Sequence, residues 1–339
     1  MEGERAVTSR CAVFVDAGYA LAAAATRVTG TSLRGGIHID YEQLITGLTT
    51  HAERQSGLPL LRVHWYDAAR DGVPDSTQRQ IGLLSRVKLR LGRIGFDGEQ
   101  KGVDLRIGLD LVSAARNAAV EVVYLVSGDD DLTEAVDEAQ AHGVQVIVLA
   151  VPLKTGEPYG LSRHLQTAAD GMETLDADTL DHAITSRRAR ATNTAPLKPA
   201  STAEQRPAPT PAILAHREPR PMIDNTVQPA PVEPAAAPAT LVFSSSTGGS
   251  SFSDPAYVHS DEMDENIDHV VDRLLHTWLE GDPGLQHAAC AENRPEIPRD
   301  VDRALLLDLS EAVGVYDLSD PVRHHLRARF WVALDRRTS

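Results

Sequence analysis

Short apolar runs alternate with stretches of helical periodicity through the first half of the chain. The runs predict strands and the stretches between them predict helices: strands at 11–15, 60–66, 120–126 and 144–150, and helices at 41–55, 76–92, 103–118 and 131–142. Strands that alternate with helices predict an α/β fold, a parallel sheet with helices on both faces. In such sheets ligands bind at the carboxyl ends of the strands, so the residues after each strand are candidates for function.

Prolines mark a boundary in the second half of the chain. Twelve of the 20 prolines lie between Ser186 and Val258, in a segment without helical or alternating periodicity. Such a segment cannot bury enough apolar area to offset the entropy of ordering, so we expect a disordered Pro/Ala/Ser-rich linker over 185–259. The linker would separate an α/β domain at 8–184 from a smaller domain at 260–337.

The segment after this linker has apolar residues at helical spacing in three places. One helix is predicted over 262–280, a second after Pro298 and a third near Asp320. Together they predict a small all-α domain whose apolar stripes form its core. The last helix also carries several arginines, which could contact RNA or the acidic face of a protein partner.

Charge and cysteine content narrow the classes of function. The chain has 48 acidic and 33 basic residues, a net charge of −15, which excludes a general nucleic-acid coat or a binder of anionic membranes. Two cysteines exclude a disulfide scaffold and a cysteine-rich zinc module. No apolar stretch reaches the ~18 residues of a membrane span, and the first residues do not resemble a signal peptide. We therefore expect a cytoplasmic protein without a membrane partner, and the excess of Arg over Lys suggests a GC-rich bacterial genome.

Aspartates follow two of the predicted strands and open a predicted helix. Asp16 follows the first strand, Asp129 and Asp131 follow the third, and Asp104 begins the helix at 103–118. If the two strands are neighbours, these carboxylates meet in one cleft, where their mutual repulsion favours binding of a divalent cation such as Mg²⁺ or Mn²⁺. A cation held in this way supports the hydrolysis of phosphodiesters.

Each aspartate also has a purely structural interpretation. Asp is a common helix N-cap, Asp131 with Glu134 fits a capping box, and Asp104 could complement a helix dipole. Asp110 and Asp130 are secondary acidic candidates. Asp110 lies about 120° around the helix from Asp104, and Asp130 is expected to face solvent. The set of four, rather than any single member, favours the metal site.

Three motifs carry these residues in a defined order. They are the strand ending in Asp16, the segment Lys101-Gly-Val-Asp104 followed by Asp110, and Ser127-Gly-Asp-Asp-Asp-Leu132 followed by a helix and Gly143. Over about 10–180, this order resembles the NYN domain of the PIN-like nuclease superfamily. The resemblance implies a PIN-like parallel sheet flanked by helices, a divalent-metal site and ribonuclease activity, with a catalytic and metal-binding set made of Asp16, Asp104, Asp129 and Asp131.

The chain departs from the usual motifs of this family at two points. Many members have Asn at the position of Tyr19, and the last motif often has Ser and Phe where this chain has Asp130 and Leu132. The resemblance favours a phosphate contact for Lys101, while Ser127 and Tyr19 complete the expected substrate-binding residues of the motifs.

Basic residues indicate where an RNA backbone could bind. The segment between Asp75 and Asp97 has no acidic residue and, as a helix, would place four arginines on one face: Arg79, Arg86, Arg90 and Arg93. A solvated helix face is the alternative interpretation of this pattern.

These observations predict a divalent-metal-dependent endoribonuclease that hydrolyses RNA phosphodiester bonds. The alternative is a catalytically silent adaptor that has kept the fold and binds RNA or a regulatory protein. Retention of four carboxylates favours the enzyme, because an abandoned metal site would be relieved by neutralising substitutions. Tyr19, at the usual Asn position, favours the adaptor.

Overall fold

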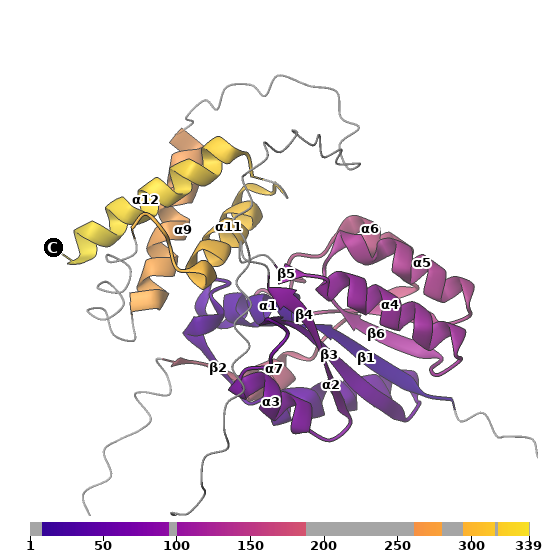
Figure 1. Ribbon diagram of the computed structural model, residues 1–339. Coiled ribbons are helices and arrows are strands. Elements are labelled where there is room, and N and C mark those ends of the chain that lie inside the picture. Colours follow the sequence, from indigo (N-terminus) through magenta and orange to yellow (C-terminus); the bar gives the residue numbers. More distant parts are fainter. Residues whose placement is uncertain (1–8, 95–99, 188–260, 280–293, 316–317, 339) are drawn as a thin grey trace, which may run out of the picture. The chain divides into compact units, whose positions relative to one another are not determined.

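The structure is a computed structural model that describes residues 9–94, 100–187, 261–279, 294–315 and 318–338. These residues fall in one compact unit, and Figure 1 shows the helices and strands that they form. The predicted linker, apart from its first three positions, lies outside the described residues, so the expected domain boundaries remain a prediction. Within the described ranges, no helix is both long enough and apolar enough to cross a bilayer.

The main sheet has seven strands among the described residues, and six of them run parallel. Its spatial order is β5 (Gln100–Lys101), β4 (Val87–Ile94), β3 (Leu60–Arg70), β1 (Cys11–Asp16), β6 (Val122–Val126), β7 (Gln145–Ala150) and β8 (Gly171–Thr174). The short β5 is antiparallel to β4. The order reverses at β1, whose neighbours are β3 and β6. Such a reversal opens a crevice at the carboxyl ends of the strands, where ligands bind in open α/β sheets.

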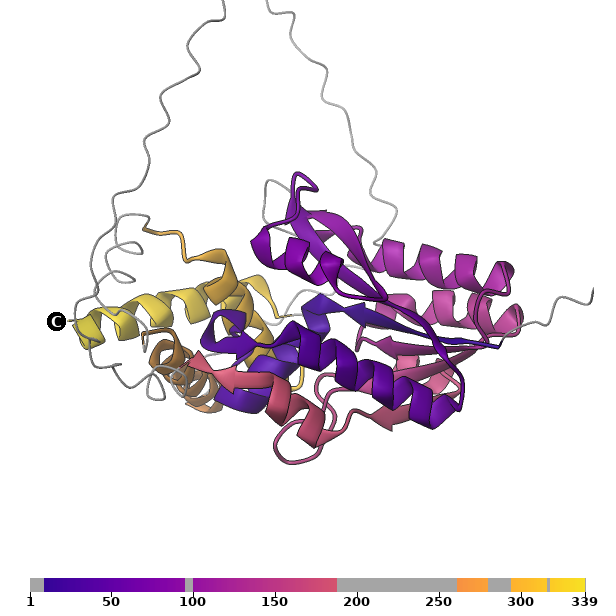
Figure 2. The same cartoon turned by 90° about the horizontal axis from the view of Figure 1, so that it is seen from below.

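Helices cover both faces of this sheet, as expected (Figures 1 and 2). One core packs the sheet against α1 (Ala17–Thr29), α2 (Tyr41–Ser56), α3 (Ser76–Leu83) and α7 (Ala177–Ala183). The second core packs the other face against α4 (Val103–Arg116), α5 (Thr133–Ala141) and α6 (Arg163–Ala168). All six residues of β1 are buried because the strand lies between the two cores, which explains why it reads as a continuous apolar run.

The predicted helix over 76–92 is wrong. Helix α3 ends at Leu83, Arg86 takes a left-handed φ of 60°, and the chain continues as β4. The first five residues of β4 alternate between Leu or Val and Lys or Arg, a period of two that suits a strand. Pairing with β3 in parallel register decides the outcome, because it satisfies the backbone groups along the edge of β4 that faces β3.

Several elements had not been predicted from the sequence. Helix α1 follows β1 without a loop, with Asp16 as its N-cap and Gly30 at a φ of 80° as its C-cap. The other unpredicted elements are a small antiparallel sheet of β2 (Ile37–Ile39) and β9 (Ile184–Ser186), two 3₁₀ turns, η1 (Arg34–Gly36) and η2 (Asp130–Leu132), and the short elements β5, β8, α6 and α7.

The three C-terminal helices are confirmed as α9 (Asp261–Leu279), α11 (Arg299–Val313) and α12 (Asp320–Thr338). Their buried core includes Leu274, Leu305 and Phe330, and it also takes in Leu33 from the segment after α1. The arginines of α12 do not form an open basic face. Within the bundle Arg327 pairs with Asp302, Arg329 with Asp268 and Arg337 with Asp272.

Candidate acidic site at the carboxyl ends of the strands

Asp16 lies at the switch point of the sheet. It ends β1 and caps α1, where its Oδ1 accepts a hydrogen bond of 2.7 Å from the backbone N–H of Gly18. The residue is only 8% exposed. Burial, reinforced by the neighbouring Asp104 carboxylate, raises the pKa of Asp16 to about 6. A carboxyl group that is buried beside another acid is a candidate for cation binding.

The loop after β6 brings the next acids to the same point. Val15 and Val126 are register partners on neighbouring strands, so Asp16 and Ser127 end up side by side. The Ser127 hydroxyl donates to Asp16 Oδ2 at 3.5 Å, and it accepts from the backbone N–H of Asp129 at 3.2 Å. Asp129 in turn accepts at 3.0 Å from the backbone N–H of Asp131. Ser127 therefore connects the two acidic motifs.

Asp104 reaches the site from a third element. It is the second residue of α4, just after Gly102, which has a φ of 77° and starts the helix sharply. Burial, with the Asp129 and Asp131 carboxylates, raises the pKa of Asp104. The pKa of Asp129 is raised as well, by burial and then by Asp131 and Asp130. Each of the four carboxylates either raises the pKa of another member or has its own pKa raised by one. The structure therefore brings the predicted set of four into one electrostatic cluster.

The four carboxylates are not preorganised as a metal-coordination site. In the part of the chain that the structure describes, no three acidic, histidine or cysteine side chains converge as they would around a metal ion. Two of the carboxylates instead point an oxygen at a backbone N–H, of Gly18 for Asp16 and of Asp131 for Asp129. The donor set nevertheless fits a hard divalent cation, because the groups are carboxylates and their mutual repulsion would be relieved by positive charge.

The two secondary acids have partners of their own. Asp110 binds the guanidinium of Arg90 and accepts from the Tyr66 hydroxyl at 3.0 Å. Burial opposes ionisation of Asp110, but these two partners prevail and lower its pKa. Asp130 accepts from the Ser162 hydroxyl and pairs with His164. Neither acid is among those that raise the pKa of Asp16 or Asp104.

The capping box suggested for Asp131 and Glu134 is not formed. Asp129 caps the 3₁₀ turn η2, and α5 starts after Leu132 without a side-chain cap. Asp131 is exposed at the rim of the cluster. The structural interpretation of this residue as a helix cap is therefore wrong.

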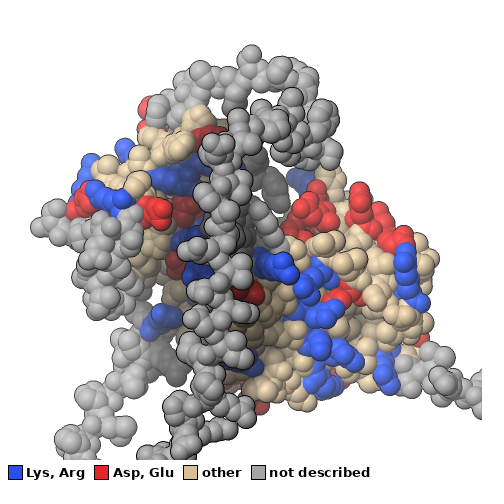
Figure 3. Space-filling model, in the orientation of Figure 1, with Lys and Arg blue, Asp and Glu red and all other residues tan. Residues whose placement is uncertain are grey.

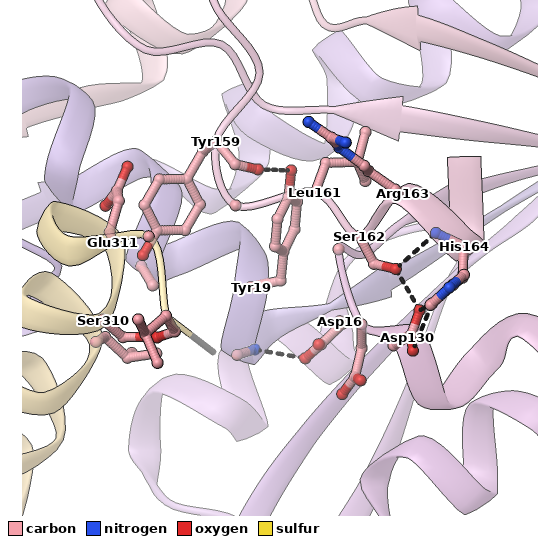
Figure 4. Close-up of a pocket in the computed structure, with 18 of the residues that line it drawn as sticks. Asp16, Tyr19, Asp130, Tyr159, Leu161, Ser162, Arg163, His164, Ser310 and Glu311 are labelled. Atoms are coloured by element: carbon pink, nitrogen blue, oxygen red, sulfur yellow. Dashed lines mark hydrogen bonds and ion pairs between the residues drawn. The ribbon is translucent and has the colours of Figure 1, made fainter. Parts of the chain in front are cut away.

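A pocket of about 950 Å³ opens beside the acidic cluster (Figure 4). Tyr19 lies in its wall and donates its hydroxyl to the backbone carbonyl of Tyr159 at 2.8 Å. The two rings lie 5.9 Å apart. Asp16 and Asp129 line this pocket together with Arg303 and Leu307 of α11. Tyr19 thus shapes the space next to the acids.

The predicted arginine face on 76–92 is not present, because its residues belong to different elements. Arg79 lies on α3, exposed Arg86 pairs with Glu53, and Arg93 points to the opposite face of β4 from Arg90. Lys101 forms β5 just before α4.

A different set of cations lies on the sheet. Arg62 of β3 and Lys88 and Arg90 of β4 surround His64, and burial together with these cations lowers the pKa of His64 to about 4, against the influence of Asp110. Figure 3 shows a band of basic side chains below an acid-rich upper edge on this view of the α/β part. The sequence pattern does not predict this group of cations, because Lys88 and Arg90 lie on a segment that was predicted to be helical.

The α/β part of the chain is thus a doubly wound domain with an acidic site at its switch point. Residues 10–176 match the family model of the NYN domain, and this part of the chain is an NYN domain, which has a PIN-like nuclease fold.

Two further similarities were found. The chain is 38% identical over 94 residues to an uncharacterized protein, y4oD, of Sinorhizobium fredii, a match that covers 27% of this chain and 44% of that relative. A crystal structure of a protein of unknown function from Vibrio parahaemolyticus is 25% identical, with a TM-score of 0.36, over 52% of this chain and 98% of that one.

Proposed function

We propose that this protein is a divalent-metal-dependent ribonuclease. The observation that supports the proposal is the cluster of Asp16, Asp104, Asp129 and Asp131 at the switch point of an NYN domain. Burial and mutual repulsion raise the pKa of three of these acids. Each unit by which the pKa of a carboxyl group is raised costs about 1.4 kcal/mol at neutral pH, a cost that a bound cation would relieve.

The residues of the site have separate tasks in this reaction. The four carboxylates would hold Mg²⁺ or Mn²⁺, which when bound supplies Lewis-acid chemistry and offsets the charge of the phosphate. Ser127 keeps the Asp16 and Asp129 segments in register through its two hydrogen bonds. Arg62 and Lys88 would attract the RNA backbone without reading its sequence, whereas the guanidinium of Arg90 is engaged by Asp110. Lys101, three residues before Asp104 in the sequence, remains the candidate for a phosphate contact that the motif implies.

Cleavage assays test this proposal directly. Purified full-length protein is incubated with labelled single-stranded RNA, structured RNA and single-stranded DNA, in Mn²⁺, in Mg²⁺ and in EDTA. We expect cleavage of RNA that requires the metal and that Asp129→Asn lowers by at least about 100-fold, a typical cost of losing an electrostatic group in an active site. Asp137→Asn, the same change on the exposed face of α5, is the matched control and should keep full activity.

Undiminished cleavage by the folded Asp129→Asn protein would contradict the role of the acidic cluster. The alternative, a silent adaptor, draws support from the two carboxylates that point at backbone N–H groups and from Tyr19 at the pocket wall. Calorimetry separates the two, because an enzyme of this kind takes up Mn²⁺ and loses that uptake in Asp129→Asn, whereas the adaptor takes up none.

A further inference from the structure

Helix α11 of the C-terminal bundle is fixed to the NYN domain beside the acidic site. Its Asp308 is 2% exposed and accepts from the Thr31 hydroxyl at 2.5 Å and from the backbone N–H of Ser32 at 2.9 Å. The Ser32 hydroxyl donates to the carbonyl of Ala304 at 3.4 Å. Leu33 completes the contact, because it is buried in the core of the bundle. This anchor determines which side chains α11 presents to the site.

Arg303, five residues before the anchor, reaches the turn that follows Asp16. A Cβ added at Gly18 would lie 3.5 Å from an Nη atom of Arg303, 3.5 Å from an Nη atom of Arg34 and 2.8 Å from Oδ1 of Asp16. Arg34 also donates to the carbonyl of Gly18 at 2.9 Å. Two guanidinium groups, one from each part of the chain, therefore meet at the turn that also carries the acid of β1.

The close approach of the two guanidiniums points to an anionic ligand between them, although acids lie nearby. Partial burial and the neighbouring Arg34 guanidinium lower the pKa of Arg303, and the carboxylates of Asp16, Asp67 and Asp104 act in the opposite direction. Within the described ranges, none of these acids forms an ion pair with Arg303, and part of the residue stays accessible to solvent. Two neighbouring guanidiniums repel one another, and they are suited to bind phosphate oxygens through short, charge-assisted hydrogen bonds.

We propose that the C-terminal bundle completes the RNA site in cis, with Arg303 and Arg34 binding a phosphate of the RNA next to Asp16. The inference rests on the proposed function for the identity of the ligand. It assigns the bundle a part in substrate binding that neither the NYN motifs nor the arginines of α12 provide. Because Arg303 lines the same pocket as Asp16 and Asp129, the bound phosphate would lie beside the acids that act on it.

Binding measured without cleavage tests the inference. The affinity of full-length protein for a fluorescent single-stranded RNA is measured by anisotropy in EDTA, at several salt concentrations. We expect Arg303→Gln to weaken binding about tenfold, as for a lost hydrogen bond between charged groups. It should also lower the slope of log affinity against log salt by about 0.7, the value for one phosphate contact on a single strand. Arg303→Lys, which keeps the charge, should keep the slope and recover part of the affinity.

Arg54→Gln is the matched control for charge. Arg54 is exposed near the end of α2, which leads to the amino end of β3, opposite the acidic site. This variant should leave affinity and slope unchanged. Melting temperatures equal to wild type would show that Arg303→Gln is folded, as expected for an exposed side chain.

Two results would overturn the inference. An Arg303→Gln protein with the affinity and slope of wild type would show that Arg303 contacts no phosphate. Tighter binding would show that Arg303 covers the site rather than serving it. A different result, no salt-dependent RNA binding by wild type in EDTA, would remove the metal-independent phosphate contact that the inference requires, whereas the metal-dependent cleavage assay decides the proposed function on its own.

Discussion

Asp16 gives a quantitative prediction, because its burial links stability to pH. Its pKa is raised from 3.8 to about 6 in the folded protein. The folded protein therefore binds the Asp16 proton more tightly than the unfolded chain does. Its contribution to stability is present below about pH 4 and is lost as the pH rises through 6. At pH 8 the ionised carboxylate costs about 3 kcal/mol, at about 1.36 kcal/mol for each pKa unit.

Asp16→Asn removes this cost and keeps a good helix cap, because Asn caps helices about as well as Asp. We expect the variant to be more stable than wild type by about 3 kcal/mol at pH 8 and by about 1 kcal/mol at pH 4.5. Urea unfolding in EDTA, followed by fluorescence of the buried Trp65, measures both differences. Asp40→Asn is the control, because Asp40 caps α2 in the same way but is exposed.

Added Mn²⁺ should reverse the order of stability. Wild type should gain about 2.7 kcal/mol at a metal concentration 100 times the dissociation constant, whereas Asp16→Asn should gain much less. The reasoning would be refuted if Asp16→Asn were no more stable than wild type at pH 8, or if its advantage did not shrink towards pH 4.5.

Two other substitutions test how the site is built. Asp308→Ala leaves the buried N–H of Ser32 without its acceptor and should destabilise the protein by about 2–4 kcal/mol. Asp308→Asn keeps an acceptor oxygen and should cost clearly less; equal losses in urea unfolding would contradict the anchor. Gly128→Ala places a Cβ 2.1 Å from the carbonyl oxygen of Gly160 and should destabilise by about 1–3 kcal/mol. Thermal melts measure this loss. Gly171→Ala is the control and should leave the melting temperature unchanged, because no atom lies within 4 Å of its new Cβ. An unchanged melting temperature for Gly128→Ala would refute the close approach to Gly160.

The sequence predicts the elements whose residues face two cores. The strands β1, β6 and β7 are continuous apolar runs because they are covered on both faces. Strand β4 could not be recognised in this way, because one of its faces carries Lys88 and Arg90 and its parallel pairing with β3 is a long-range contact. In such a segment the local pattern of residues does not determine whether a helix or a strand forms. The outcome depends on pairing with a distant strand, which exists only in the folded sheet.

The acids of the site follow from the sequence, but the cations do not. Asp16 and Asp129 stand directly after strands, a position that the parallel-sheet rule singles out. Arg34 and Arg303 reach the same turn from a 3₁₀ turn and from the C-terminal bundle. No local pattern connects them. Their convergence depends on the contact between Asp308 and Ser32, two residues far apart in the chain.

The contact between Ser32 and Asp308 also has a consequence during synthesis of the protein on the ribosome. Ser32 and Asp308 are 276 residues apart, and a ribosome that adds roughly 5–20 residues per second needs about 14–55 s to make the segment between them. During this interval Leu33 has no bundle core to enter. Arg303 has not yet been made, so a nascent chain holds the acids of the proposed nuclease without its second guanidinium. The messenger being translated would thus meet a complete site only after Arg303 has been made and the bundle has folded.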